Sequence, residues 1–85
     1  QYPNPFNPRT TIALDLPRAA EVSLRIYDLR GALVRTLVAG HRPAGQHAVV
    51  WDGQDGGGRP VASGVYFAEV RADHERRLQK LTLVR

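Results

Sequence analysis

Hydrophobic residues recur at every second position in a series of short runs along this chain. The runs cover residues 10–16, 21–28, 32–38, 46–51, 65–72 and 76–85, and a further short edge segment lies at 61–62. Alternation with a period of two is typical of strands with one buried and one solvated face. The run at 32–38 could also form a short helix, but its β-branched residues and flanking glycines favour a strand. The pattern predicts an all-β chain of six or seven strands, folded as a β-sandwich.

The alternation also predicts which side chains form the core. Those expected to face inward are Ile12, Leu14, Leu16, Val22, Leu24, Ile26, Val49, Trp51, Tyr66, Ala68, Val70, Leu81 and Leu83, and His47 shares a face with Val49 and Trp51. Val65, Phe67, Glu69 and Arg71 are expected on the outer face of their strand. Trp51 ends a central run, so we expect it to anchor the core; a tryptophan platform for binding is the alternative.

The opening residues are rich in proline, with Pro3, Pro5 and Pro8 placed among asparagines and aromatic side chains. Proline fixes φ and restricts the residue before it, so this segment cannot be helical. Composition alone suggests a spacer between domains. The alternative is that Tyr2 and Phe6 pack on the sandwich, and we expect residues 1–9 to be a packed lead-in to a domain spanning residues 10–85.

Size and composition limit the classes of function that the chain could have. The 85 residues suit one domain, and without cysteine neither a disulfide framework nor a thiolate metal site can stabilise it. The chain has no methionine, so we expect it to be a piece of a longer precursor with any signal peptide upstream. The net charge of +4 comes mainly from scattered arginines, which favours solubility over nucleic-acid binding. Phe67, Arg71 and Arg76 supply only a small basic and aromatic patch.

The glycine-rich loop at 52–60 is the obvious place for a metal or a phosphate. Asp52 and Asp55 are weak candidates for calcium ligands, because an EF-hand loop needs a glutamate at its twelfth position, where this chain has Ser63. The lysine and hydroxyl residue of a phosphate loop are also missing. A catalytic triad would have to combine Ser63 and Asp52 with one of His41, His47 or His74, and nothing in their spacing indicates one. We therefore expect no metal, no cofactor and no enzymatic activity.

The order of the motifs carries a resemblance. The chain runs from YPNPFNP through VSLRIYDLRG, AGQH, WDGQD and SGVYF to the ending KLTLVR. This order resembles the type A C-terminal sorting domain of the type IX secretion system, which overlaps in sequence with the Ig-like domain of the flagellar hook-capping protein. The resemblance implies a seven-stranded antiparallel Ig-like or fibronectin III-like β-sandwich at the end of a secreted protein. It also implies two partners, an N-terminal cargo domain and the outer-membrane secretion machinery, which carries the cargo from the periplasm to the cell surface or medium.

Carried over residue by residue, the resemblance ties recognition to Asp28, Gly31, Gly64, Tyr66, Lys80, Leu81, Leu83 and Arg85. Arg85 stands where many members have lysine, which preserves the charge but changes its geometry. If Leu81 and Leu83 face the core, Lys80, Thr82 and Val84 face outward, and strand addition at an exposed edge could recognise the segment. A structural Ig-like spacer or binding module, and a subunit that self-associates through its sheet edges, are the alternatives.

Overall fold

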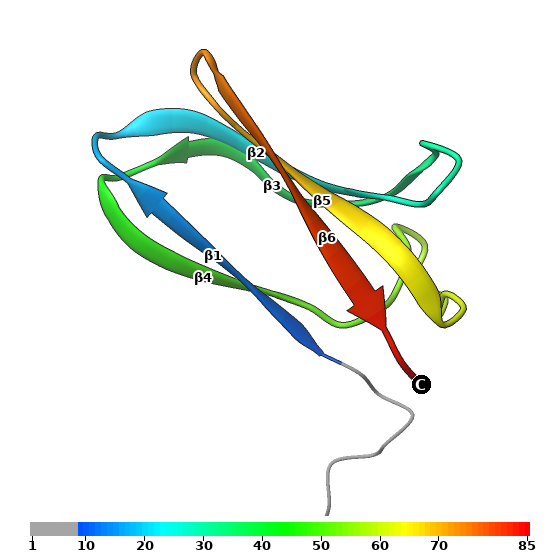
Figure 1. Ribbon diagram of the computed structural model, residues 1–85. Coiled ribbons are helices and arrows are strands. Elements are labelled where there is room, and N and C mark those ends of the chain that lie inside the picture. Colours follow the sequence, from blue (N-terminus) through cyan, green and yellow to red (C-terminus); the bar gives the residue numbers. More distant parts are fainter. Residues whose placement is uncertain (1–8) are drawn as a thin grey trace, which may run out of the picture.

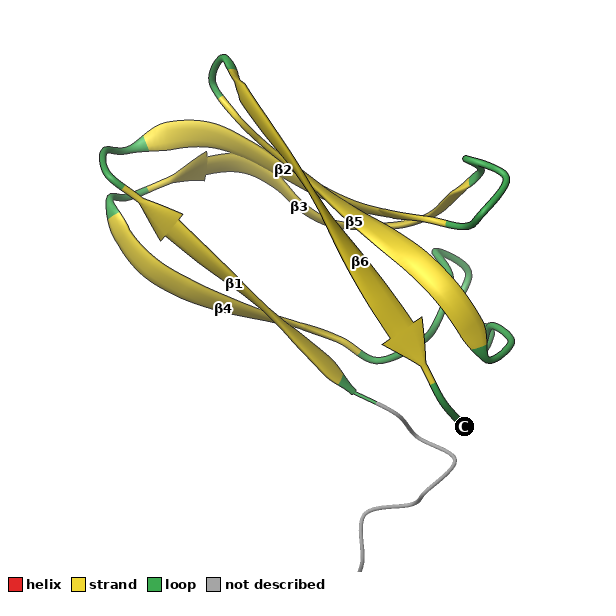
Figure 2. Cartoon of the chain, viewed as in Figure 1, coloured by secondary structure: helices red, strands yellow, loops and turns green. Residues whose placement is uncertain are grey.

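The computed structural model describes residues 9–85, which form two antiparallel sheets facing each other (Figure 1). The strands are β1 (Thr10–Leu16), β2 (Ala20–Tyr27), β3 (Leu33–Arg42), β4 (Gly45–Trp51), β5 (Gly64–Ala72) and β6 (Glu75–Leu83). One sheet has the order β1-β4 and the other β3-β2-β5-β6. Within the described range, Figure 2 shows only strands and loops. The prediction of an all-β sandwich is confirmed.

The core lies between the two sheets and follows the period-two pattern. Its buried residues are Ile12, Leu14, Leu16, Ala20, Val22, Leu24, Ile26, Val38, Trp51, Tyr66, Ala68, Leu81 and Leu83. In β1 and β2 every second side chain is buried, because successive side chains of a strand point to opposite faces. Val49 and Val70, also expected inside, are partly buried. Phe6, another expected core residue, lies outside the described residues, as does all of the 1–9 lead-in except Arg9.

The strand count corrects the prediction, because the described residues form six strands rather than seven. The expected edge segment at 61–62 does not join a sheet. Pro60, just before it, has no N–H to donate and makes only an isolated bridge with Gln54. The Val61 N–H donates to the Gly53 carbonyl at 3.0 Å. This segment therefore closes the preceding loop, and the β1-β4 sheet has only two described strands.

The third strand is longer than predicted. The predicted run ends at Val38, but β3 continues to Arg42. Gly40 pairs with Val22 and has a φ of 140°, a conformation that a residue without a side chain adopts readily. The β2-β3 register also shifts twice. These shifts place Arg35 opposite Ile26, so the arginine lies on the inner side of the sheet, near the loop that follows β4.

Candidate functional site

The last strand, β6, holds most of the residues that the sequence linked to recognition. Among the described residues it pairs with β5 alone, so its other edge carries no strand ladder. Lys80 and Thr82 are exposed, and Val84, just beyond the strand, is 70% exposed. Leu81 and Leu83 are buried in the core. The strand therefore presents a row of exposed side chains beside a backbone edge, while its leucines fix it to the sandwich.

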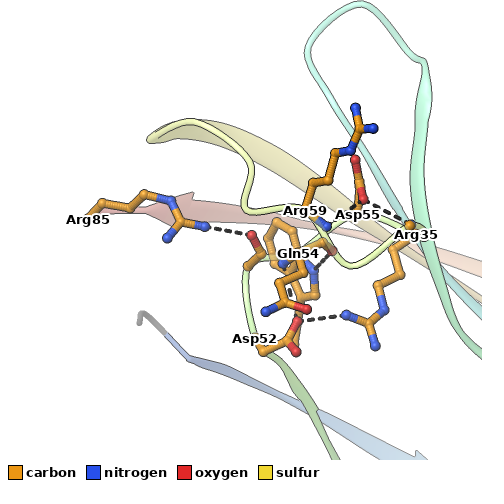
Figure 3. A network of polar contacts seen from close by, with 9 residues as sticks. Arg35, Asp52, Gln54, Asp55, Arg59 and Arg85 are labelled. Carbon is orange, nitrogen blue, oxygen red and sulfur yellow. Dashed lines mark hydrogen bonds and ion pairs between the residues drawn. The ribbon is translucent and has the colours of Figure 1, made fainter. Parts of the chain in front are cut away.

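Arg85 folds back onto the loop at residues 52–62. Its backbone N–H donates to the Ser63 hydroxyl at 3.0 Å, and its guanidinium donates from Nε to the Val61 carbonyl and from Nη2 to the Gly53 carbonyl at 2.7 Å. Figure 3 shows this side chain reaching toward the loop. A planar guanidinium can donate to two carbonyls in a fixed geometry, which an ammonium cannot reproduce. Arginine in place of lysine thus has a structural consequence in this chain.

A polar network attaches the loop at 52–62 to the sandwich (Figure 3). The buried Trp51 indole donates from Nε1 to the Gln54 carbonyl at 2.9 Å. The Asp52 carboxylate accepts from Arg35 Nη1 at 2.7 Å and from the Gln54 N–H at 3.2 Å. The Gly56 N–H donates to the Val34 carbonyl at 3.0 Å. The loop is therefore held to the end of β4 and to β3.

The loop carboxylates considered as calcium ligands accept hydrogen bonds from nearby groups. Asp55 Oδ1 accepts the N–H groups of Gly57 at 2.9 Å and Arg59 at 3.0 Å. The Arg59 bond is the main reason why the pKa of Asp55 lies below its usual value. Asp52 is bound by Arg35. Within residues 9–85, no group of three histidine, cysteine or acidic side chains could hold a metal ion. Both aspartates shape the turn.

Three of the groups considered for catalysis, Ser63, His41 and His47, have partners elsewhere. The Ser63 hydroxyl accepts the Arg85 N–H, and His47 Nε2 lies 2.8 Å from the Pro43 carbonyl. His41 Nδ1 lies 3.2 Å from a carboxylate oxygen of Glu21. In the described part of the chain, neither histidine makes a hydrogen bond with Ser63 or Asp52. These contacts are those of turns and strand ends.

Asp28 and Gly31 build the turn between β2 and β3. Asp28 Oδ1 accepts the N–H groups of Arg30 and Ala32, each at 2.9 Å. The Ala32 bond is the largest cause of a lowered pKa of Asp28. Gly31 has a φ of 82° and donates its N–H to the Asp28 carbonyl at 3.0 Å. In the sheet, β5 separates β2 from β6, so this turn does not join the exposed row on β6.

Gly64 and Tyr66 begin β5 and serve the core. The Tyr66 hydroxyl donates to the Ala62 carbonyl at 2.6 Å. Its ring meets Trp51 edge to face, with the ring centroids 5.2 Å apart. Tyr66 also pairs in register with Leu81 of β6. Gly64 pairs in register with Leu83 of the same strand, so both residues connect β5 to β6.

The burial of Glu69 was not predicted from the sequence. Its position in β5 is on the outer face, as expected, yet it is only 5% exposed. Its carboxylate accepts from Arg76 Nε at 2.6 Å and from Arg71 Nε at 3.2 Å. The Arg76 hydrogen bond is the main reason why the pKa of Glu69 lies below its usual value. The predicted β5-β6 hairpin was the available signal, because it places both arginines beside Glu69.

Two packed antiparallel sheets define a β-sandwich, and the family comparison makes it an Ig-like one. The chain belongs to the FlgD Ig-like domain family, whose pattern matches residues 5–75. A similar crystal structure is that of FlgD from P. aeruginosa, with a TM-score of 0.70 and 28% sequence identity. That match covers 86% of this chain and 60% of the FlgD chain.

No curated protein matches the chain. Among residues 9–85, no helix is long and apolar enough to cross a membrane. The Ig-like part of the sequence resemblance is therefore confirmed by the family and the solved structure, whereas neither comparison addresses the type IX sorting part.

Proposed function

We propose that this chain is a non-catalytic Ig-like sorting module, which directs a larger secreted protein through the type IX secretion system to the cell surface or medium. The observation that carries the proposal is the exposed edge of β6, with Lys80, Thr82 and Val84 beside it. The order of sequence motifs supports the same function. The secretion machinery and the N-terminal cargo domain are the proposed partners.

Strand addition supplies a mechanism for recognition. A receptor strand that pairs with the open edge of β6 would form backbone hydrogen bonds, while exposed side chains provide selectivity. Arg76, Arg77 and Lys80 give this strand three positive charges against the one negative charge of Glu75. A net charge on an edge strand deters pairing between copies. The same charges favour a receptor strand that is acidic.

The proposed lack of catalysis rests on how the polar groups are used. Asp52, Asp55 and Ser63 hold the loop at 52–62 through hydrogen bonds to neighbouring groups. Glu69 is occupied by two arginines on an open sheet face. An activated acid or nucleophile needs a shielded pocket and an aligned partner. The contacts of these groups instead stabilise the fold.

The test is export of a reporter fused to the N-terminal side of the chain in a bacterium with a type IX system. The double variant Lys80→Glu/Val84→Glu changes exposed side chains and leaves Leu81 and Leu83 in the core. We expect the wild-type fusion in the medium or on the surface and the double variant in the periplasm. Arg59→Glu, on an exposed loop, is the matched control and should be exported normally. Equal export of the double variant, with unchanged melting, would refute recognition through β6.

Family membership favours a second function, a structural Ig-like module that stays within a larger assembly, as in a hook-capping protein. A groove of about 360 Å³ beside β1 and the β5-β6 hairpin, lined in part by Leu14, Leu16 and Val70, gives such a module a surface for contact. This function predicts that the chain works equally well when another folded domain follows it. Light scattering separates it from self-assembly, which would give particles larger than a monomer.

A further inference from the structure

The outer face of the four-stranded sheet carries three rows of side chains in cross-strand register. The rows are Ser23-Arg71-Arg76, Arg25-Glu69-Leu78 and Tyr27-Phe67-Lys80. Four cationic side chains stand against one carboxylate in these rows, which leaves a net of three positive charges. The four cations are exposed, whereas the carboxylate is buried. This face therefore offers positive charge to solvent.

Arg71 and Arg76 are direct cross-strand partners in this face. Like charges placed opposite each other destabilise a strand pair. Glu69 offsets this repulsion by accepting the Nε donor of each guanidinium, one on each carboxylate oxygen. One carboxylate balances only one of the two charges, so the pair keeps an excess positive charge.

The guanidinium groups of Arg71 and Arg76 are positioned by Glu69 and keep donors available for a ligand. Each donates to Glu69 through Nε, and within residues 9–85 neither makes a further hydrogen bond or ion pair through its Nη groups. Their side chains are 57% and 52% exposed. Guanidinium donors in a fixed orientation match the paired oxygens of a carboxylate or phosphate. Because Glu69 already restrains both arginines, binding orders fewer side-chain torsions.

We propose that Arg71 and Arg76 form a binding site for an oxyanion group, a carboxylate or a phosphate, with Glu69 as the positioning residue. Arg25 lies directly across from Glu69, and Lys80 lies in the next row, so both add attraction for an acidic ligand. The site lies on an open sheet face, which suits a group at the surface of a larger acidic molecule. It shares Arg76 and Lys80 with the strand of the sorting proposal but uses neither the backbone edge of β6 nor Arg85, so it is tested by binding to the isolated chain rather than by export.

The test is a nuclear magnetic resonance titration of the isotope-labelled chain at constant ionic strength. One arm uses inorganic phosphate and the other an oligoglutamate peptide, so that the arms separate the two sources of oxyanion. We expect saturable shifts confined to the amides of residues 69–71 and 76–78 and to the Nε–H signals of Arg71 and Arg76. The arm that saturates at lower concentration identifies the preferred group.

Two substitutions separate a built site from general charge attraction. Arg76→Gln should weaken binding about tenfold, as expected for the loss of a charge-assisted hydrogen bond. Arg59→Gln removes the same charge from the loop after β4 and should change affinity less than twofold, roughly the effect of a screened distant charge. Equal losses in both variants, or shifts that spread over the chain without saturating, would overturn the proposal.

The positioning role of Glu69 has a test of its own. Glu69→Gln makes the face more positive, so a purely electrostatic attraction predicts tighter binding of the anion. If Glu69 orients the two arginines, binding weakens despite the added positive charge. Tighter binding would therefore refute the positioning role. Should this variant fail to fold, as judged by its melting curve, the comparison of Arg76→Gln with Arg59→Gln still decides whether the site exists.

Discussion

Replacing Trp51 with phenylalanine tests the claim that this residue anchors the core and the loop after β4. Trp51 is fully buried, meets the Tyr66 ring edge to face, and donates its indole N–H to the Gln54 carbonyl. Phenylalanine keeps an aromatic ring at the site but cannot donate. The substitution therefore removes the hydrogen bond and part of the buried volume while preserving the character of the core.

The expected loss follows from two contributions. Leaving the Gln54 carbonyl without its donor costs about 1–3 kcal/mol. Losing roughly two buried carbon-sized groups at about 0.8 kcal/mol each removes about 1.6 kcal/mol more. Trp51→Phe should thus lower the free energy of unfolding by about 3–5 kcal/mol. A domain of this length has a total stability of roughly 4–13 kcal/mol, so the loss is a large share of the total.

The assay is urea unfolding followed by far-ultraviolet circular dichroism, which does not depend on the tryptophan signal. Val50→Ala is the matched control, because Val50 is the neighbouring residue on the opposite face and is 46% exposed. This control should lose less than about 1 kcal/mol. A loss of under about 1 kcal/mol for Trp51→Phe, similar to the control, would refute the anchoring role.

Three further predictions concern other contacts. The lowered pKa of Glu69 means that its stabilising contribution is present above the pKa of the unfolded state and is lost as the pH falls through the folded value. The difference in melting between wild type and Glu69→Gln should therefore shrink in acid; a difference that stays constant across the whole acid range in which the chain remains folded would contradict this. Gly31→Ala should lower the free energy of unfolding in urea by about 1–2 kcal/mol, because a residue with a side chain is strained at a φ of 82°. No atom lies within 4 Å of the new Cβ, so a steric clash does not add to this cost. Gly57→Ala, at a position without positive φ, is its control and should cost nothing; equal losses would contradict the backbone explanation. Arg85→Lys should speed amide hydrogen exchange in the loop at 52–62, since an ammonium cannot hold the carbonyls of both Val61 and Gly53. Unchanged exchange would contradict the proposal that Arg85 stabilises this loop.

The local alternation was sufficient to predict the class of fold. In β1, Ile12, Leu14 and Leu16 are buried as the period of two requires. The pattern could not give the end of β3, because a glycine normally signals a turn and Gly40 here continues a strand in register with β2. The pattern also predicted a strand segment at 61–62, whereas the Val61 N–H donates to the carbonyl of Gly53 in the loop.

The site was less accessible from the sequence, because its contacts join residues far apart in the chain. Arg85 reaches Gly53 across 32 positions, and no local pattern indicates that a terminal arginine will bind loop carbonyls. The burial of Glu69 depends on Arg76 from the neighbouring strand. The exposed row at Lys80 and Thr82 was predictable, because it requires only that the leucines between them face the core.

The sorting function is tested most directly by the fraction of a reporter that leaves the cell when this chain is its last domain. The comparison is the same reporter with a second folded domain placed after Arg85, in the same type IX host. We predict that the first fusion reaches the surface or medium and that the second stays in the periplasm, since the open edge of β6 must be free for recognition. Equal amounts outside the cell for both fusions, or periplasmic retention of both, would contradict it.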